Sequence, residues 1–186
     1  MPRLLTRSNL LTLSLVLGAA VMWGAAGVKT ATTPSSSNEI DLVAAPTLGA
    51  GVPELDIVYF YRYDCPHCAG VSASLERLVA NRTDVAVHYA QLPVDRTETA
   101  PVAAACAEEA GAFEAYHERA RQGLLDPNAV PEGCDLPAAQ RRVERDYETA
   151  DDLGVDVVPT LFIGRNRVNG AVDGTALDSL VAVALR

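Results

Sequence analysis

Cysteine is scarce in this chain: only four of its 186 residues are cysteines. Small secreted folds that depend on disulfides for their stability carry a much higher share, so the sequence excludes a disulfide scaffold. With 49% apolar residues, the part of the chain that follows any targeting segment is long enough to form one domain with its own core. Each cysteine pair therefore needs its own explanation.

Basic residues are also few. The chain has 15 Lys and Arg against 24 Asp and Glu, which gives a formal net charge of −9. A surface this acidic repels phosphate backbones, so the composition argues against nucleic acid as a partner. The N-terminal segment departs from this trend, because it carries Arg3, Arg7 and Lys29 and no acid.

Residues 1–29 combine that basic start with an uncharged, largely apolar run over Asn9–Val28. This pattern is typical of an export signal, and about 20 residues are also enough to span a bilayer. The residues leave two outcomes open: cleavage after the small residues Ala25–Gly27, or retention as a membrane anchor with Trp23 at the interface. Both predict an extracytoplasmic protein, secreted or membrane-anchored.

Residues 30–53 are rich in Thr, Ser, Pro, Ala and Gly and follow no helical or strand period, so we expect a flexible linker there. The domain is predicted over residues 54–186. Its hydrophobic patterns give the order β-α-β, a helical insertion over about 97–152, and then β-β-α. The last helix is predicted to begin at Thr175, where Thr175–Asp178 resembles a capping box.

The motif Cys65-Pro66-His67-Cys68 stands where the first predicted strand gives way to a helix. Unpaired N–H groups and the positive end of the helix dipole favour a thiolate at Cys65 there. Pro66 suits the first helical position, and His67 can add a donor or positive charge beside the thiolate. Cys68, one turn deeper, can close a disulfide or resolve a mixed one. The motif predicts thiol–disulfide exchange and favours an oxidant, since a stable thiolate makes its disulfide more oxidising.

Two other readings of this motif are a structural disulfide and a zinc site completed by further ligands. The zinc reading is weak because Cys106 and Cys134 form no second Cys-x-x-Cys pair. We therefore predict no metal and no cofactor. The isolated residues His88 and His117 are predicted to be structural or exposed rather than ligands.

Cys106 and Cys134 both fall in the helical insertion. Free thiols are at risk in an oxidising compartment, so a structural disulfide is the first interpretation. Closing a loop of about 29 residues would contribute roughly 3–4 kcal/mol in the chain-entropy model. A free, buried Cys106 is the alternative.

A second motif, Gly154-Val155-x-x-Val158-Pro159-Thr160, follows about 90 residues after the first. The strand, the Cys-Pro-His-Cys motif, the helical insertion and this second motif together resemble the thioredoxin superfamily, and the central His and the insertion resemble its DsbA-like branch. The resemblance implies an α/β, thioredoxin-like fold with an inserted helical subdomain, preceded by an N-terminal hydrophobic signal or anchor helix.

The resemblance also implies roles for individual residues. Cys65 would be the exposed nucleophile and Cys68 the resolving thiol. Pro159 would be a cis-proline beside the disulfide, and Val158 and Thr160 would contact substrate peptide.

The sequence departs from the family at one place. Many thioredoxin-like proteins carry a buried acid six residues before the first cysteine, and Tyr59 stands there in this chain. Proton transfer at Cys68 then needs another group or water. Asp64 is the nearest acid, and we expect it to point to solvent.

The predicted function is the oxidation of cysteine pairs in reduced exported polypeptides. The resemblance implies a membrane reoxidase of the DsbB or vitamin-K-epoxide-reductase type as partner. A membrane-anchored disulfide reductase is the nearest alternative, and a non-catalytic peptide- or metal-binding module is the alternative from another class. An isomerase is disfavoured because no separate dimerisation domain is present.

Overall fold

The computed structural model describes residues 36–42 and 45–186. The predicted signal or anchor segment, residues 1–29, lies outside the described residues. In the part of the chain that is described, no helix combines the length and apolar character needed to cross a membrane.

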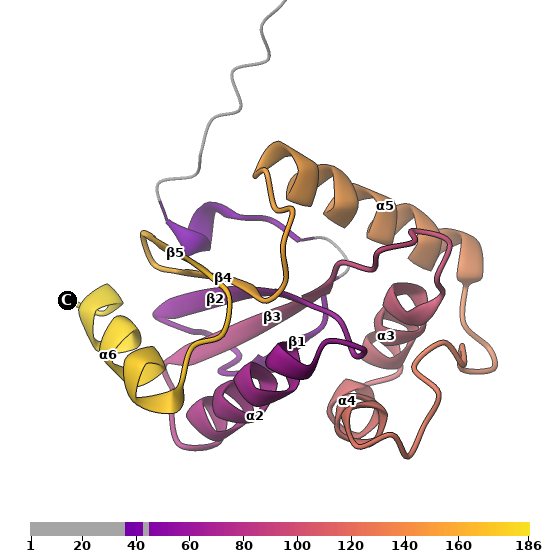
Figure 1. The fold of residues 1–186 in the computed structure, drawn as a ribbon. Coiled ribbons are helices and arrows are strands. Elements are labelled where there is room, and N and C mark those ends of the chain that lie inside the picture. The colour runs from indigo at the N-terminus through magenta and orange to yellow at the C-terminus, as the bar shows by residue number, and fades with distance from the viewer. Residues whose placement is uncertain (1–35, 43–44) are drawn as a thin grey trace, which may run out of the picture. The chain divides into compact units, whose positions relative to one another are not determined.

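A mixed five-stranded sheet in the order β1-β3-β2-β4-β5 forms the centre of the domain (Figure 1). The two central strands, β2 (Leu55–Tyr61) and β3 (Val85–Gln91), run parallel. The edge strand β1 (Thr47–Gly49) pairs antiparallel with β3. On the other side, β4 (Thr160–Ile163) pairs antiparallel with β2 and with β5 (Asn166–Asn169). From β2 onward the elements follow the predicted order of β-α-β, a helical insertion and β-β-α.

Side chains of β2 are buried on both faces of the sheet. Tyr59 and its neighbours two residues away pack under α2 (Pro66–Ala80) and α6 (Gly174–Ala184), which lie on one side of the sheet in Figure 1. Val58 and Phe60 form a second cluster on the opposite face. Burial on both faces explains why this strand reads as a continuous apolar run rather than an alternating one.

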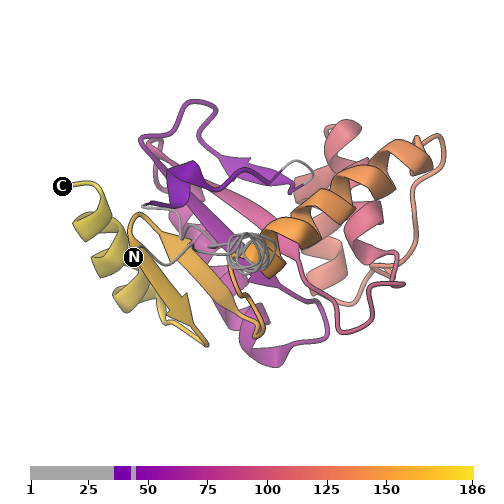
Figure 2. The same cartoon turned by 90° about the horizontal axis from the view of Figure 1, so that it is seen from above.

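The helical insertion consists of α3 (Ala100–Glu109), α4 (Phe113–Arg121) and α5 (Leu136–Asp152). Helix α5 lies along α3 in both views (Figures 1 and 2). Small side chains on α3 let the two helices approach closely, with Ala105 and Cys106 packed against Ala139 and Val143. The predicted insertion is therefore an ordered layer with its own small core.

Part of the predicted flexible linker is structured, which corrects the prediction for residues 30–53. A 3-10 turn, η1 (Ser37–Glu39), is held by the N–H of Ser37, which donates to the carbonyl oxygen of Gly164 at 2.6 Å. Strand β1 follows, with Leu48 opposite Val87 of β3. Both contacts join backbone to distant segments, so the composition of this region could not show them.

The start of the last helix also differs from the prediction. Asp173, not Thr175, is the capping residue, and its carboxylate accepts the N–H of Ala176 at 2.8 Å. An Asp two residues earlier supplies the same acceptor as the predicted Thr.

Candidate active site

Cys65 caps the N-terminus of α2. Its Sγ accepts the backbone N–H of Cys68 at 3.2 Å, and the two residues form a disulfide with their Cα atoms 5.2 Å apart. Pro66 takes the first helical turn, where the absence of its N–H costs no hydrogen bond. The sulfur of Cys65 therefore lies where a helix stabilises negative charge.

The two cysteines differ in exposure. Cys65 is 7% exposed and Cys68 is 1% exposed, whereas Pro66 and His67 lie on the surface between them. An incoming thiol can reach Cys65 more readily than Cys68. Asp64, immediately before the motif, points to solvent as expected: its side chain is 75% exposed and pairs with Arg62 at 2.9 Å.

The loop before β4 lies beside this disulfide. The Val158–Pro159 peptide bond is cis, and the carbonyl oxygen of Val158 lies 4.0 Å from Cys65 Sγ. The structure thus brings together two motifs that are about 90 residues apart in the sequence. Backbone of this loop next to the reactive sulfur is suited to pairing with an extended peptide.

Thr160 differs from the prediction that it contacts substrate. It is fully buried, and its hydroxyl donates to the carbonyl oxygen of Val157 at 2.8 Å. As the first residue of β4 it points into the domain, so its side chain braces the loop and does not reach the surface.

Tyr59 lies beneath the motif on β2. Its hydroxyl donates to the carbonyl oxygen of Cys68 at 2.8 Å and lies 3.3 Å from the hydroxyl of Ser72. Burial raises the pKa of Tyr59, so the phenol stays neutral. The sequence showed that the usual acid is replaced, but it did not show where the hydroxyl of Tyr59 would bond.

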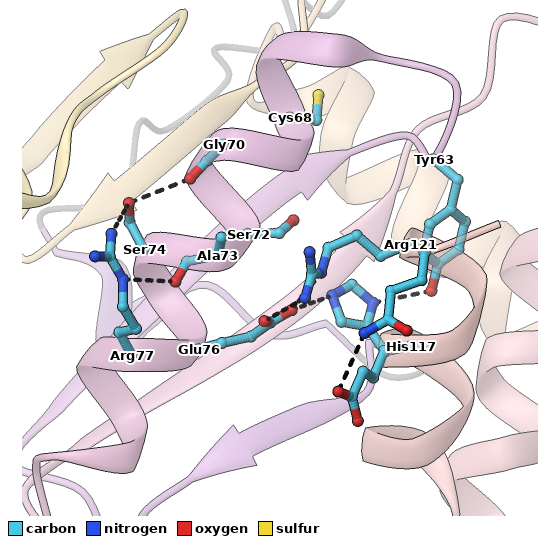
Figure 3. A network of polar contacts seen from close by, with 12 residues as sticks. Tyr63, Cys68, Gly70, Ser72, Ala73, Ser74, Glu76, Arg77, His117 and Arg121 are labelled. Atoms are coloured by element: carbon cyan, nitrogen blue, oxygen red, sulfur yellow. Dashed lines mark hydrogen bonds and ion pairs between the residues drawn. The ribbon is translucent and has the colours of Figure 1, made fainter. Parts of the chain in front are cut away.

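A polar network next to this site was missed from the sequence. Figure 3 shows Tyr63, just before the motif, bonded to His117 of α4, with Glu76 of α2 and Arg121 of α4 beyond it. The hydroxyl of Tyr63 lies 2.9 Å from His117 Nδ1, and His117 Nε2 lies 3.5 Å from Glu76 Oε1. His117 is 1% exposed and is surrounded by aromatic rings. The network joins the helical insertion to the helix that carries the cysteines.

The charge of Glu76 is set by these contacts. Burial acts to raise its pKa, but the neighbouring His117 and Arg121 outweigh burial, so the pKa lies below its ordinary value. Arg121 contacts both carboxylate oxygens, at 2.9 and 3.0 Å. No local spacing in the sequence marks this group, because Glu76 comes from α2 whereas His117 and Arg121 come from α4.

The second cysteine pair lies in the helical insertion. Cys106 of α3 and Cys134 of the segment before α5 form a disulfide, with their Cα atoms 5.6 Å apart. Across residues 36–42 and 45–186, no three His, Cys, Asp or Glu side chains converge in a way that could hold a metal ion.

A family model described as thioredoxin matches residues 43–182. The chain is similar to a periplasmic thioredoxin-like protein from Salmonella enterica serovar Typhimurium, with 28% identity and a TM-score of 0.67 over 76% of this chain and 90% of that one. It is also similar to a thioredoxin-like oxidoreductase from Silicibacter pomeroyi DSS-3, with 27% identity and a TM-score of 0.59 over 76% of this chain and 92% of that one.

A curated relative, the Na(+)/H(+) antiporter NhaA of Herminiimonas arsenicoxydans, is 25% identical over 189 residues and 90% of this chain. The chain spans only 30% of the length of that antiporter, so we do not assign the antiporter's transport activity to this chain. The match to the family model covers most of the domain, including the Cys-Pro-His-Cys motif and the cis-proline. The chain therefore belongs to the thioredoxin family.

Proposed function

We propose that this enzyme works outside the cytoplasm and oxidises cysteine pairs in exported polypeptides. One observation carries the proposal: Cys65 Sγ receives a helix N–H and lies 4.0 Å from the backbone of Val158 in the cis-proline loop. The first contact stabilises the thiolate that leaves when a client is oxidised, and the loop offers backbone to the client chain. His67 and Pro66, exposed between the cysteines, would meet the client first.

The reaction consists of two exchanges. A client thiolate attacks Cys65 Sγ, which breaks the bond to Cys68 and leaves Cys68 as a thiolate that takes up a proton. A second client thiolate then attacks the client sulfur of the mixed disulfide and releases Cys65 as a thiolate. The client gains a disulfide, and its two electrons remain on the Cys65–Cys68 dithiol.

The proposed function includes an extracytoplasmic location for the enzyme and a membrane protein that reoxidises it. The basic, apolar start of the chain and the periplasmic relative support an extracytoplasmic site. The reduced dithiol then needs a membrane reoxidase, of the DsbB or vitamin-K-epoxide-reductase type, to return to the disulfide. Retention of residues 1–29 as an anchor would keep the enzyme beside such a partner.

The direction of electron flow is tested by the reduction potential of Cys65–Cys68. We expect a value near about −120 mV, as in strong oxidants, when the protein is equilibrated with glutathione buffers. A value near about −270 mV would instead assign the enzyme to the reductases. A Cys106→Ala/Cys134→Ala variant, measured in parallel, ensures that only one dithiol is titrated.

The clients are tested by trapping. A Cys68→Ala variant cannot resolve mixed disulfides from the enzyme side, so client proteins should accumulate on Cys65 when it is expressed in the native host. A Cys65→Ala/Cys68→Ala variant is the matched control. If the single variant captures no more protein than the double variant, the proposed role in client oxidation is wrong.

A further inference from the structure

The hydroxyl of Tyr59 is fully used by two hydrogen bonds. It carries one proton, which it donates to the carbonyl oxygen of Cys68, an atom that can only accept. The hydroxyl of Ser72 must then be the donor in its 3.3 Å contact with Tyr59. Tyr59 therefore has no proton to exchange with the sulfur of Cys68, and its raised pKa keeps the phenol neutral.

Other ionisable groups around Cys68 are engaged elsewhere or exposed to solvent. The hydroxyl of Tyr61 lies 3.2 Å from that of Tyr63, which in turn bonds to His117. His67 lies on the surface, and Cys65 is bonded to Cys68. The surrounding titratable and charged groups come from β2, the turn after it, α2, β3 and α4: Tyr59, Tyr61, Arg62, Tyr63, Asp64, Cys65, His67, Glu76, Tyr89, His117 and Arg121. Of these, Asp64 is 75% exposed and paired with Arg62.

Glu76 is the less exposed of the two carboxylates in this set, and it lies too far along α2 to serve Cys68. Eight residues separate the two, which is about 12 Å along the helix axis at 1.5 Å per residue. Its two oxygens are held by Arg121 at 2.9 and 3.0 Å. Cys68, at 1% exposure, thus lies over a neutral phenol instead of a base.

We propose that Tyr59 is a positioning residue that holds the first turn of α2 through the carbonyl of Cys68, and that solvent is the proton acceptor of the Cys68 thiol. The inference rests on the proposed function, because it concerns the same disulfide. In the resolving step, the Cys68 thiol gives its proton to water or hydroxide and attacks Cys65 Sγ. The bond from Cys65 to its mixed-disulfide partner breaks, and the partner leaves as a thiolate that is then protonated. Cys68 is oxidised and the partner sulfur is reduced.

A pH dependence follows for the resolution of a mixed disulfide by Cys68. Without a nearby base, the resolution rate follows the thiolate fraction of Cys68, so it rises about tenfold per pH unit below the pKa of that thiol. An ordinary thiol pKa of about 8.5 is enough to extend this rise through neutral pH. The second exchange with a client, in which a client thiol releases Cys65, does not involve Cys68. Its rate therefore does not depend on the thiolate fraction of Cys68.

The test uses the full-length reduced protein and oxidised glutathione. Cys65 forms a glutathione adduct, and acid quenching with mass spectrometry follows its resolution by Cys68 from pH 5.5 to 9. We expect the wild-type rate to rise about tenfold per pH unit across neutral pH. Tyr59→Phe should change the rate by a single factor, up to about tenfold, at every pH and keep that slope.

Tyr59→Glu provides the opposite case, because it places a base beneath Cys68 that acts directly or through one water. We expect it to raise the rate at pH 7 by up to about 100-fold and to flatten the profile. Tyr89→Phe is the matched control: Tyr89 lies opposite Tyr59 in the sheet, and its buried hydroxyl has no hydrogen-bond partner among the described residues. Its profile should match that of the wild type.

Two outcomes would overturn the inference even if Tyr59→Glu fails to fold. A wild-type rate that is constant between pH 6 and 8 would show that a base already serves Cys68. A profile that is steeper in Tyr59→Phe than in the wild type would show that Tyr59 itself accepts the proton. Failure of Cys65 to form any adduct would overturn the proposed function and this inference with it, so the two failures are distinguishable.

Discussion

The two disulfides of this domain are built for different tasks. Cys65 and Cys68 are three residues apart at the start of a helix, where a backbone N–H points at the Cys65 sulfur. Cys106 and Cys134 are 28 residues apart, and Cys106 lies in the last turn of α3. The first position stabilises a thiolate, whereas a helix C-terminus disfavours one. The chemistry of each pair is set by its place on a helix.

The same two pairs differ in what they contribute to stability. In the chain-entropy model a four-residue loop stabilises the fold by about 2 kcal/mol and a 29-residue loop by about 3.6 kcal/mol. The short loop can open without releasing distant parts of the chain, while the long one joins α3 to the segment before α5. One pair can therefore cycle between redox states in a domain that the other pair helps to keep folded.

The largest effect is expected from Cys65→Ser. Without the nucleophilic sulfur, oxidation of a dithiol peptide should fall to background, by at least about 10³-fold, while the protein stays folded. Peptide oxidation followed by chromatography measures the loss, and circular dichroism monitors the fold. Residual activity above a tenth of wild type would mean that another sulfur starts the exchange.

The next effect concerns the second pair. Cys106→Ala/Cys134→Ala should lower the free energy of unfolding by about 3–4 kcal/mol and leave peptide oxidation nearly unchanged, because neither sulfur lies at the cis-proline loop. Guanidinium unfolding of oxidised protein gives the first quantity. Equal stability of the variant and the wild type would contradict a structural role for this disulfide.

A smaller difference in stability is expected between variants of two buried tyrosines near the Cys65–Cys68 disulfide. Tyr59→Phe leaves the Cys68 carbonyl without its side-chain donor and should lower the free energy of unfolding by about 1–2 kcal/mol. Tyr89→Phe removes a buried hydroxyl that has no hydrogen-bond partner within the described residues, so it should be neutral or stabilising. Urea unfolding of both variants tests the difference, and the reverse ranking would contradict the hydrogen bonds described for Tyr59.

The smallest effect concerns the network that links the insertion to α2. Because the pKa of Glu76 lies below its ordinary value of 4.5, its ionised form stabilises the fold above that pH. This contribution is lost as the pH falls through the lowered pKa. Glu76→Gln should therefore be less stable than the wild type at pH 7 and approach it below about pH 4, as measured by thermal unfolding across pH. A difference that stays constant with pH would contradict an ionised Glu76.

Much of this protein could be predicted from local patterns. The strand over β2, the Cys-Pro-His-Cys motif at the start of α2 and the insertion between β3 and β4 follow from apolar periodicity and from the position of Pro66. These features depend on neighbours within a turn or a strand, so a single sequence contains the information. The redox role of the cysteine pair could be inferred from the same few residues.

Only the three-dimensional structure shows the contacts between distant segments. The pairing of β1 with β3, the burial of Thr160 and the position of Tyr59 under Cys68 each depend on which strands become neighbours. His117 shows the same limit: the sequence left a structural and an exposed position open, and the structure buries it between α2 and the sheet. Periodicity tells which side of an element is buried, but packing decides which partner each buried polar group meets, and here those partners surround the reactive disulfide.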